Sequence, residues 1–120
     1  MLSIFIQDGF TLTGKIAARP GLHGEVCFVY RPALPEDVYE YQRKRDAAKT
    51  AREQLDIDAR LLVDDGRTRG HIESWDVVDV DDKPIPLTVA TIRRLYTSAI
   101  NTLLNHVTGY VATFEDAEKN

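Results

Sequence analysis

Residues 72–107, IESWDVVDVDDKPIPLTVATIRRLYTSAINTLLNHV, carry the clearest structural pattern of the sequence. This stretch holds the only tryptophan of the chain, then an acidic turn with two prolines, then a strongly amphipathic segment. Apolar residues recur there at the three- and four-residue spacing of one helix face, namely Ile92, Leu95, Tyr96, Ala99, Ile100, Leu103, Leu104 and Val107. The spacing predicts one continuous helix, with Thr88 as its N-cap and Gly109 just past its end.

The segment before that helix permits two interpretations. Ile72 and Trp75 share one face if His71–Trp75 is helical, whereas Trp75–Val80 is rich in valine and suits a strand. We favour a short helix that continues into an extended segment. Because Trp75 lies between apolar residues, we interpret it as a core residue rather than a binding hot spot. The predicted core residues are Ile72, Trp75, Ile92, Leu95, Ile100 and Leu103.

Upstream of this stretch lies a charged segment that we expect to be helical. Pro35 suits the first helical position, and the acidic pair Glu36-Asp37 suits the positive end of the helix dipole. Small apolar residues recur at helical spacing through Leu55 and on towards Val63. The spacing predicts one long helix, which the segment 64–66, DDG, brings to an end.

The first 31 residues have the character of strands and turns. We expect strands over Leu2–Gln7, Phe10–Ala18 and Val26–Tyr30, with a hairpin turn at Asp8-Gly9. The second of these places Phe10, Leu12 and Ile16 on one face. We interpret Gly14, which interrupts this apolar pattern, as a β-bulge.

These elements predict an α+β fold in a single domain of 1–120. Residues 1–31 are expected to form an antiparallel three-stranded sheet or hairpin. A helical module over 35–107 then supplies two long helices and a short one. The segment 110–120, which becomes acidic towards its end, is expected to form a flexible tail. A length of 120 residues agrees with one domain.

Composition bounds the class of protein. Apolar residues make up 43% and charged residues 28%, as in an ordinary globular domain, and the net charge is −4. Cys27 alone cannot build a disulfide framework, which fits a reducing compartment. We find neither the basic start of a signal peptide nor an apolar run long enough to cross a bilayer, so we expect a cytoplasmic protein with no membrane contact.

The chemically versatile side chains form no recognisable site. His23, His71 and His106 lack metal-ligand spacing, and one cysteine cannot complete a zinc site. Asp79 to Lys83 begins like a calcium loop, but Pro84 occupies the position where that loop needs glycine. Phosphate-binding, dinucleotide-binding and serine-nucleophile motifs do not occur. We therefore predict a protein without catalytic residues, metal ligands or a cofactor.

One basic cluster raises the question of nucleic acid. Arg43, Lys44 and Arg45 are followed by Lys49, and aromatic Tyr39 and Tyr41 are nearby, as in proteins that stack bases beside a phosphate backbone. The same helix carries Glu36, Asp37, Glu40, Asp46 and Glu53. Mixed charge is typical of a solvated helix face, so we rank nucleic acid below protein as a partner.

The order of these segments resembles a known family. The chain has a charged helix, followed by Ile72-x-Ser74-Trp75-Asp76, an acidic turn with 84–88, PIPLT, and a helix beginning Ile92-x-x-Leu95. This order is similar to that of the small tail assembly chaperones of long-tailed bacteriophages and prophages. The resemblance spans about Leu34 to Val107 and is most specific over Ile72–Thr88. The turn often has glycine where this chain has Asp82.

The resemblance implies a non-enzymatic protein of the host bacterial cytoplasm. It would bind the tape measure protein, help recruit tail tube protein subunits, and be absent from the mature virion; self-association is compatible with it. Expected contact residues flank the core, namely Tyr39, Tyr41, Arg45, Arg52, Tyr110 and Phe114. The alternatives are a structural virion component, such as a head–tail connector or tail terminator, and, third, a small nucleic-acid binder.

Overall fold

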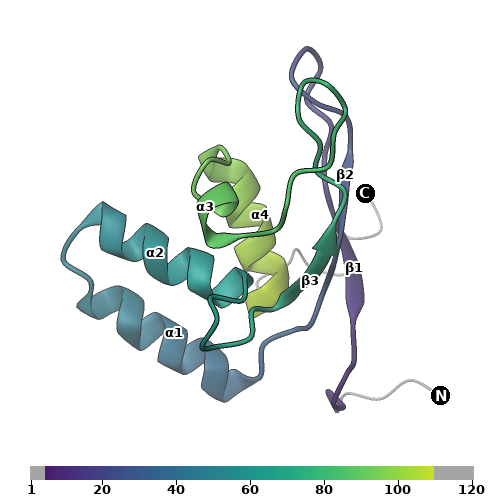
Figure 1. Cartoon of the computed structure of the whole chain (residues 1–120). Coiled ribbons are helices and arrows are strands. Elements are labelled where there is room, and N and C mark those ends of the chain that lie inside the picture. Colours follow the sequence, from purple (N-terminus) through teal and green to yellow (C-terminus); the bar gives the residue numbers. More distant parts are fainter. Residues whose placement is uncertain (1–4, 110–120) are drawn as a thin grey trace.

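Three antiparallel strands form a sheet that carries the helices on one face (Figure 1). The computed structural model describes residues 5–109. The strands are β1 (Leu12–Ile16), β2 (Val26–Tyr30) and β3 (Ile72–Trp75), and β2 lies in the middle. The helices are α1 (Pro35–Ala47), α2 (Ala51–Leu62), α3 (Val89–Ile92) and α4 (Thr97–Thr108). The predicted α+β class and the three-stranded antiparallel sheet are confirmed.

The third strand comes from the tryptophan segment, which corrects the short helix that we expected there. β3 pairs with β2, so that Trp75 faces Phe28 and Ile72 faces Tyr30. A bulge between Val29 and Tyr30 shifts the register by one residue. A bulge of this kind lets two residues three apart point to the same face of a sheet. The shared face of Ile72 and Trp75 is therefore real, but a bulged strand produces it and not a helix.

The N-terminal hairpin is also different from the prediction. Residues 5–7 form no strand, and the rest of the predicted Leu2–Gln7 strand lies outside the described residues. The Asp8-Gly9 turn does form, with Gly9 at φ +79°. Gly14 pairs regularly with Phe28, so it marks no bulge. It is required because a Cβ at this position would lie 2.9 Å from His106 Cδ2 and would overlap the Phe28 ring.

The long charged helix is interrupted. α1 ends at Ala47 and α2 begins at Ala51, so the predicted single helix is a helical hairpin. Thr50 caps α2: its side chain accepts a hydrogen bond from Glu53 N at 3.1 Å, and Glu53 Oε2 accepts one from Lys49 N at 2.9 Å. Two reciprocal caps of this kind compete with the continuation of a helix through the same residues.

The terminal helix is interrupted as well. Thr88 caps α3 through Thr91 N, as expected, but α3 ends at Ile92 and α4 starts only at Thr97. Tyr96 adopts extended backbone between them. Its hydroxyl lies 2.6 Å from His23 Nε2, and the Arg19 guanidinium lies over its ring. Gly109 ends α4 in the left-handed conformation, as predicted.

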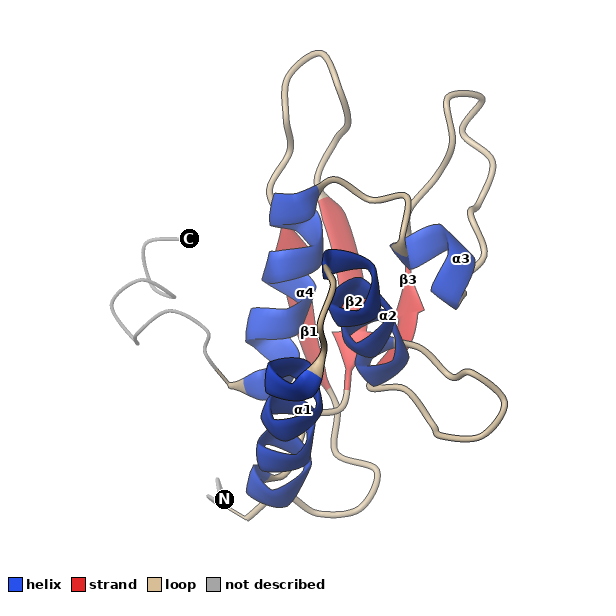
Figure 2. Cartoon of the chain, turned by 90° about the vertical axis from the view of Figure 1, so that its left-hand side faces the viewer, coloured by secondary structure: helices blue, strands red, loops and turns tan. Residues whose placement is uncertain are grey.

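The core lies between the sheet and the helices (Figure 2). α4 packs across the inner face of β1 and β2, where the His106 ring meets the Phe28 and Tyr30 rings edge-on. Of the predicted core residues, Ile72, Ile92, Ile100 and Leu103 are buried, and Trp75 and Leu95 are partly buried against the core. Trp75 Nε1 also donates to Ile85 O at 2.7 Å, which ties β3 to the proline segment.

None of the helices within 5–109 combines the length and the apolar character that crossing a membrane requires.

Candidate functional site: a cleft beside the first strand

Large apolar side chains lie exposed at the start of β1. Phe10 is 44% exposed, Leu12 42% and Ile6 40%, and Leu34, which precedes α1, is 40% exposed. Soluble proteins rarely expose several such residues together unless something binds there. This end of the molecule is therefore the first place to look for a partner site.

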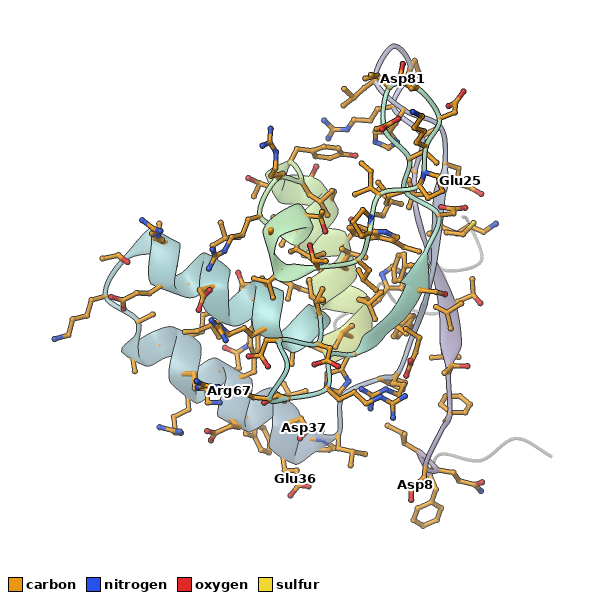
Figure 3. The ribbon with its side chains drawn as sticks, in the orientation of Figure 1. Asp8, Glu25, Glu36, Asp37, Arg67 and Asp81 are labelled. Carbon is orange, nitrogen blue, oxygen red and sulfur yellow. The ribbon has the colours of Figure 1, made fainter. Side chains whose placement is uncertain are left out.

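Three of these residues line one cavity of about 240 Å³, which we call the N-terminal cleft. Its apolar walls are Ile6, Phe10, Pro32 and Leu34. The Asp8-Gly9 turn shapes one side, because Phe10 N donates to Gln7 O at 3.0 Å and positive φ at Gly9 reverses the chain. Figure 3 shows Asp8 at this end of the sheet, with Asp37 on the neighbouring start of α1.

The remaining lining of the N-terminal cleft is mostly polar, and neighbouring residues hold several of these side chains in place. Glu73 Oε1 lies 2.7 Å from Arg31 Nε and accepts a hydrogen bond from Arg69 Nη2 at 2.7 Å. The Arg31 side chain also donates to Gly70 O. Asp37 Oδ2 accepts a hydrogen bond from Leu34 N at 3.2 Å and caps α1. These contacts fix polar side chains beside the apolar ones, so the cleft has a mixed lining.

His71 also lines the N-terminal cleft. Its Nδ1 lies 2.8 Å from Arg31 O, and the backbone N of Arg31 donates to His71 O at 2.7 Å. Burial lowers the pKa of the His71 imidazole below its usual value of 6.5, and the nearby Arg31 charge acts in the same direction. The ring is thus held neutral at physiological pH and donates from Nδ1 to the carbonyl.

The expected contact residues on the helical hairpin are not assembled into one surface. Tyr39 is 73% exposed on α1, whereas Tyr41 is only 8% exposed and donates to Asp58 Oδ1 at 2.6 Å. Arg45 Nε donates to the same carboxylate oxygen at 3.1 Å. Tyr41 is therefore wrong as a surface contact residue: with Arg45 and Asp58 it holds α1 against α2. Tyr110 and Phe114 lie outside the described residues.

Arg52 belongs to a second surface, at the free end of the helical hairpin. An open groove of about 730 Å³ runs there between α1, α2 and Arg93. We call it the hairpin groove. Two of the other basic residues near it are engaged: Arg43 pairs with Glu40, and Arg93 pairs with Asp56. These pairings reduce the basic surface that a phosphate backbone would need.

Residues 5–109 contain no group of three or more histidine, cysteine and acidic side chains that could hold a metal ion. The acidic turn at 79–83 uses its carboxylates differently. Asp79 Oδ1 accepts hydrogen bonds from Asp81 N at 2.8 Å and from Lys83 N at 3.0 Å, which stabilises the turn itself.

The N-terminal cleft was not foreseen from the sequence. Period-2 spacing placed Phe10, Leu12 and Ile16 on one face, but within β1 only Gly14 and Ile16 are buried. Alternation shows which residues share a face and does not show how far the covering helix extends along it. The dense apolar residues around the Asp8-Gly9 turn were the available signal.

Comparison of the chain with family models, with curated proteins and with solved structures found no match.

Proposed function

We propose that this protein is a non-enzymatic tail assembly chaperone of a long-tailed bacteriophage or prophage. The proposal combines the resemblance at Ile72–Thr88 with one structural observation, the exposed apolar side chains at and beside the N-terminal cleft. A chaperone for a long amphipathic helix needs an apolar surface that stays accessible and a polar rim that keeps it soluble. In this proposal the tape measure protein is the client.

The size of the N-terminal cleft favours a protein partner over a metabolite. Pockets for small ligands usually enclose about 300–1,000 Å³ and surround most of the ligand. The cavity of about 240 Å³ is smaller than that range. Exposed Leu12, which continues the apolar surface along β1, would extend the contact to the next turn of a bound helix.

The resemblance supplies the rest of the proposal. The chaperone would act in the host bacterial cytoplasm, keep the tape measure protein soluble, help recruit tail tube protein subunits, and leave before the virion is complete. The rival proposal is a structural virion component. The two differ in one outcome, since only a virion component remains in purified particles.

Co-expression with the product of a very long, helical neighbouring reading frame, the expected tape measure protein, tests the proposal. We expect a soluble complex with the unaltered chain, and its loss with Phe10→Asp, because a carboxylate would then be buried against the client. Leu22→Asp is the matched control, since Leu22 is 65% exposed but lies in the loop between β1 and β2. A client that stays insoluble with the unaltered chain, or a chain that remains in purified virions, would overturn the proposal.

A further inference from the structure

The end of α4 lies against the segment that leads into the N-terminal cleft. Ala33 N donates a hydrogen bond to Val107 O at 2.8 Å. Leu34, the next residue after Ala33, lines the N-terminal cleft and is 40% exposed. Gly109, the last residue that the structure describes, follows Val107 by two positions. The chain after Gly109 therefore leaves the fold beside one wall of this cleft.

α4 runs antiparallel to β1 and leaves the start of that strand uncovered (Figure 2). At the start of α4, Ser98 Oγ accepts a hydrogen bond at 3.0 Å from Arg19, which follows β1 in the chain. Near the end of α4, His106 Cδ2 lies 2.9 Å from where a Cβ of Gly14 would be. Leu12 lies two positions before Gly14 and shares its face of the sheet, yet it is 42% exposed. Leu12 is therefore the first uncovered position of this face beyond the helix.

The sequence that follows Gly109 begins with side chains suited to covering such a surface. Residues 110–114 read YVATF, with two aromatic rings and a valine, whereas residues 115–120 read EDAEKN. An aromatic side chain buries about 150–250 Å² when it packs. Five extended residues span up to about 17 Å, and Leu34 is next to the residue that is hydrogen-bonded to α4. The two aromatic rings can therefore reach the wall of the N-terminal cleft.

We propose that Tyr110–Phe114 lies over Leu12, Phe10 and Leu34 and closes the N-terminal cleft of its own chain. A segment tethered by a short stretch of backbone is present at an effective concentration in the millimolar range. A free partner of equal affinity would have to reach that concentration to compete with it. The contact lies within one chain, so it is independent of the proposed function.

The contact is also reversible. Ordering five residues costs backbone and side-chain entropy, which offsets much of the gain from burying their apolar surface. A longer amphipathic partner would bury more surface on the same side chains and would displace the segment. If the proposed function holds, Tyr110–Phe114 thus covers the apolar side chains until the client arrives.

Nuclear magnetic resonance of the full chain gives the direct measurement. We expect nuclear Overhauser contacts between the ring protons of Tyr110 or Phe114 and the methyl groups of Leu12 or Leu34. An equimolar mixture of isotope-labelled and unlabelled chain separates contacts within one chain from contacts between copies. Rings that contact neither leucine, contacts that arise only between copies, or residues 1–4 found in place of the rings would overturn the inference.

Matched substitutions in the full chain give the second measurement. Phe114→Asp would bury a carboxylate against apolar side chains, so the contacts with Leu12 and Leu34 should be lost. Thr113→Asp adds the same charge one residue earlier and should leave them in place, because successive side chains of an extended segment point to opposite sides. Circular dichroism checks that both variants are folded. Contacts that survive in Phe114→Asp, or that disappear equally in Thr113→Asp, contradict the proposed placement.

Discussion

At the scale of single residues, Gly14 shows how one missing side chain shapes the core. Phe28, its strand partner, is 1% exposed, and its ring occupies the space where a Cβ of residue 14 would lie. His106 closes the same space from α4, with its ring 5.1 Å from that of Phe28. Neither ring has room to retreat in a packed interior.

Gly14→Ala is therefore expected to destabilise the fold by about 1–3 kcal/mol, the usual range for an overpacked core. Urea unfolding followed by tryptophan fluorescence measures the change. Gly24→Ala is the control, because nothing lies within 4 Å of a Cβ there and its backbone is not left-handed. Equal midpoints for the two variants would show that the Phe28 ring moves aside at no cost.

His71 makes the stability depend on pH. Its pKa in the folded protein is lowered, chiefly by burial, below the value of 6.5 expected when unfolded. As pH falls through that value, the unfolded chain takes up a proton that the folded chain resists. Its stabilising contribution is thus complete above pH 6.5 and declines below it.

We expect the free energy of unfolding to fall between pH 7.5 and pH 5.5, and to fall less steeply in His71→Gln, which keeps a donor for Arg31 O. The difference between the two slopes isolates His71 from the other histidines. The carboxylates with lowered pKa, such as Asp65 at about 2, titrate outside this window. Parallel slopes for the two proteins would contradict the assignment.

At the scale of elements, the α1–α2 hairpin depends on a buried carboxylate. Asp58 is 5% exposed and is the buried charged residue of the described chain. It accepts hydrogen bonds from Tyr41 and Arg45 on the facing helix. Asp58→Ala would leave the buried Tyr41 hydroxyl without its partner, at a cost of about 1–3 kcal/mol.

Urea unfolding again gives the measurement, with Asp46→Asn as the control because Asp46 is exposed on α1. Tyr41→Phe removes the donor and keeps the ring, so it should cost less than Asp58→Ala. If Asp58→Ala unfolds at the same urea concentration as the unaltered chain, the two helices are held together by apolar contacts alone.

The two helix breaks, before α2 and before α4, show which features of the fold can be predicted from the sequence. The division between α1 and α2 was visible in Thr50-x-x-Glu53, a capping pattern, but helical spacing continued across it and concealed the break. The break at Tyr96 left no local signal, because the contacts of its ring come from Arg19 and His23 far away in the chain. Local patterns predicted β2, the Thr88 cap of α3 and the Gly109 end of α4. Long-range contacts determine the breaks that these patterns missed.

β3 shows the same limit in a sheet. A spacing of three between Ile72 and Trp75 is a helical signal unless the partner strand is known, because only pairing with β2 reveals the bulge. The N-terminal cleft depends on pairing and packing too, since the exposure of Phe10 and Leu12 follows from where α4 ends. Neither the strand pairing nor the position where α4 ends can be read from the residues next to Phe10 and Leu12.

At the scale of the whole molecule, the N-terminal cleft lies far from the turn that precedes α3. Asp8 and Asp37, beside the N-terminal cleft, lie at one end of the molecule, and Asp81, in that turn, lies at the other (Figure 3). Substitutions at distant sites without shared partners usually act independently, so a change at this turn should leave client binding unaffected.

Phe10→Asp should abolish capture of the tape measure protein. Val80→Asp introduces the same charge on a side chain that is 99% exposed at the distant turn, so it should leave capture unchanged and is the matched control. Pull-down of the client by each variant supplies the readout, and circular dichroism checks that both variants are folded. Loss of capture with Val80→Asp as well would mean that the client contacts more of the molecule than the N-terminal cleft.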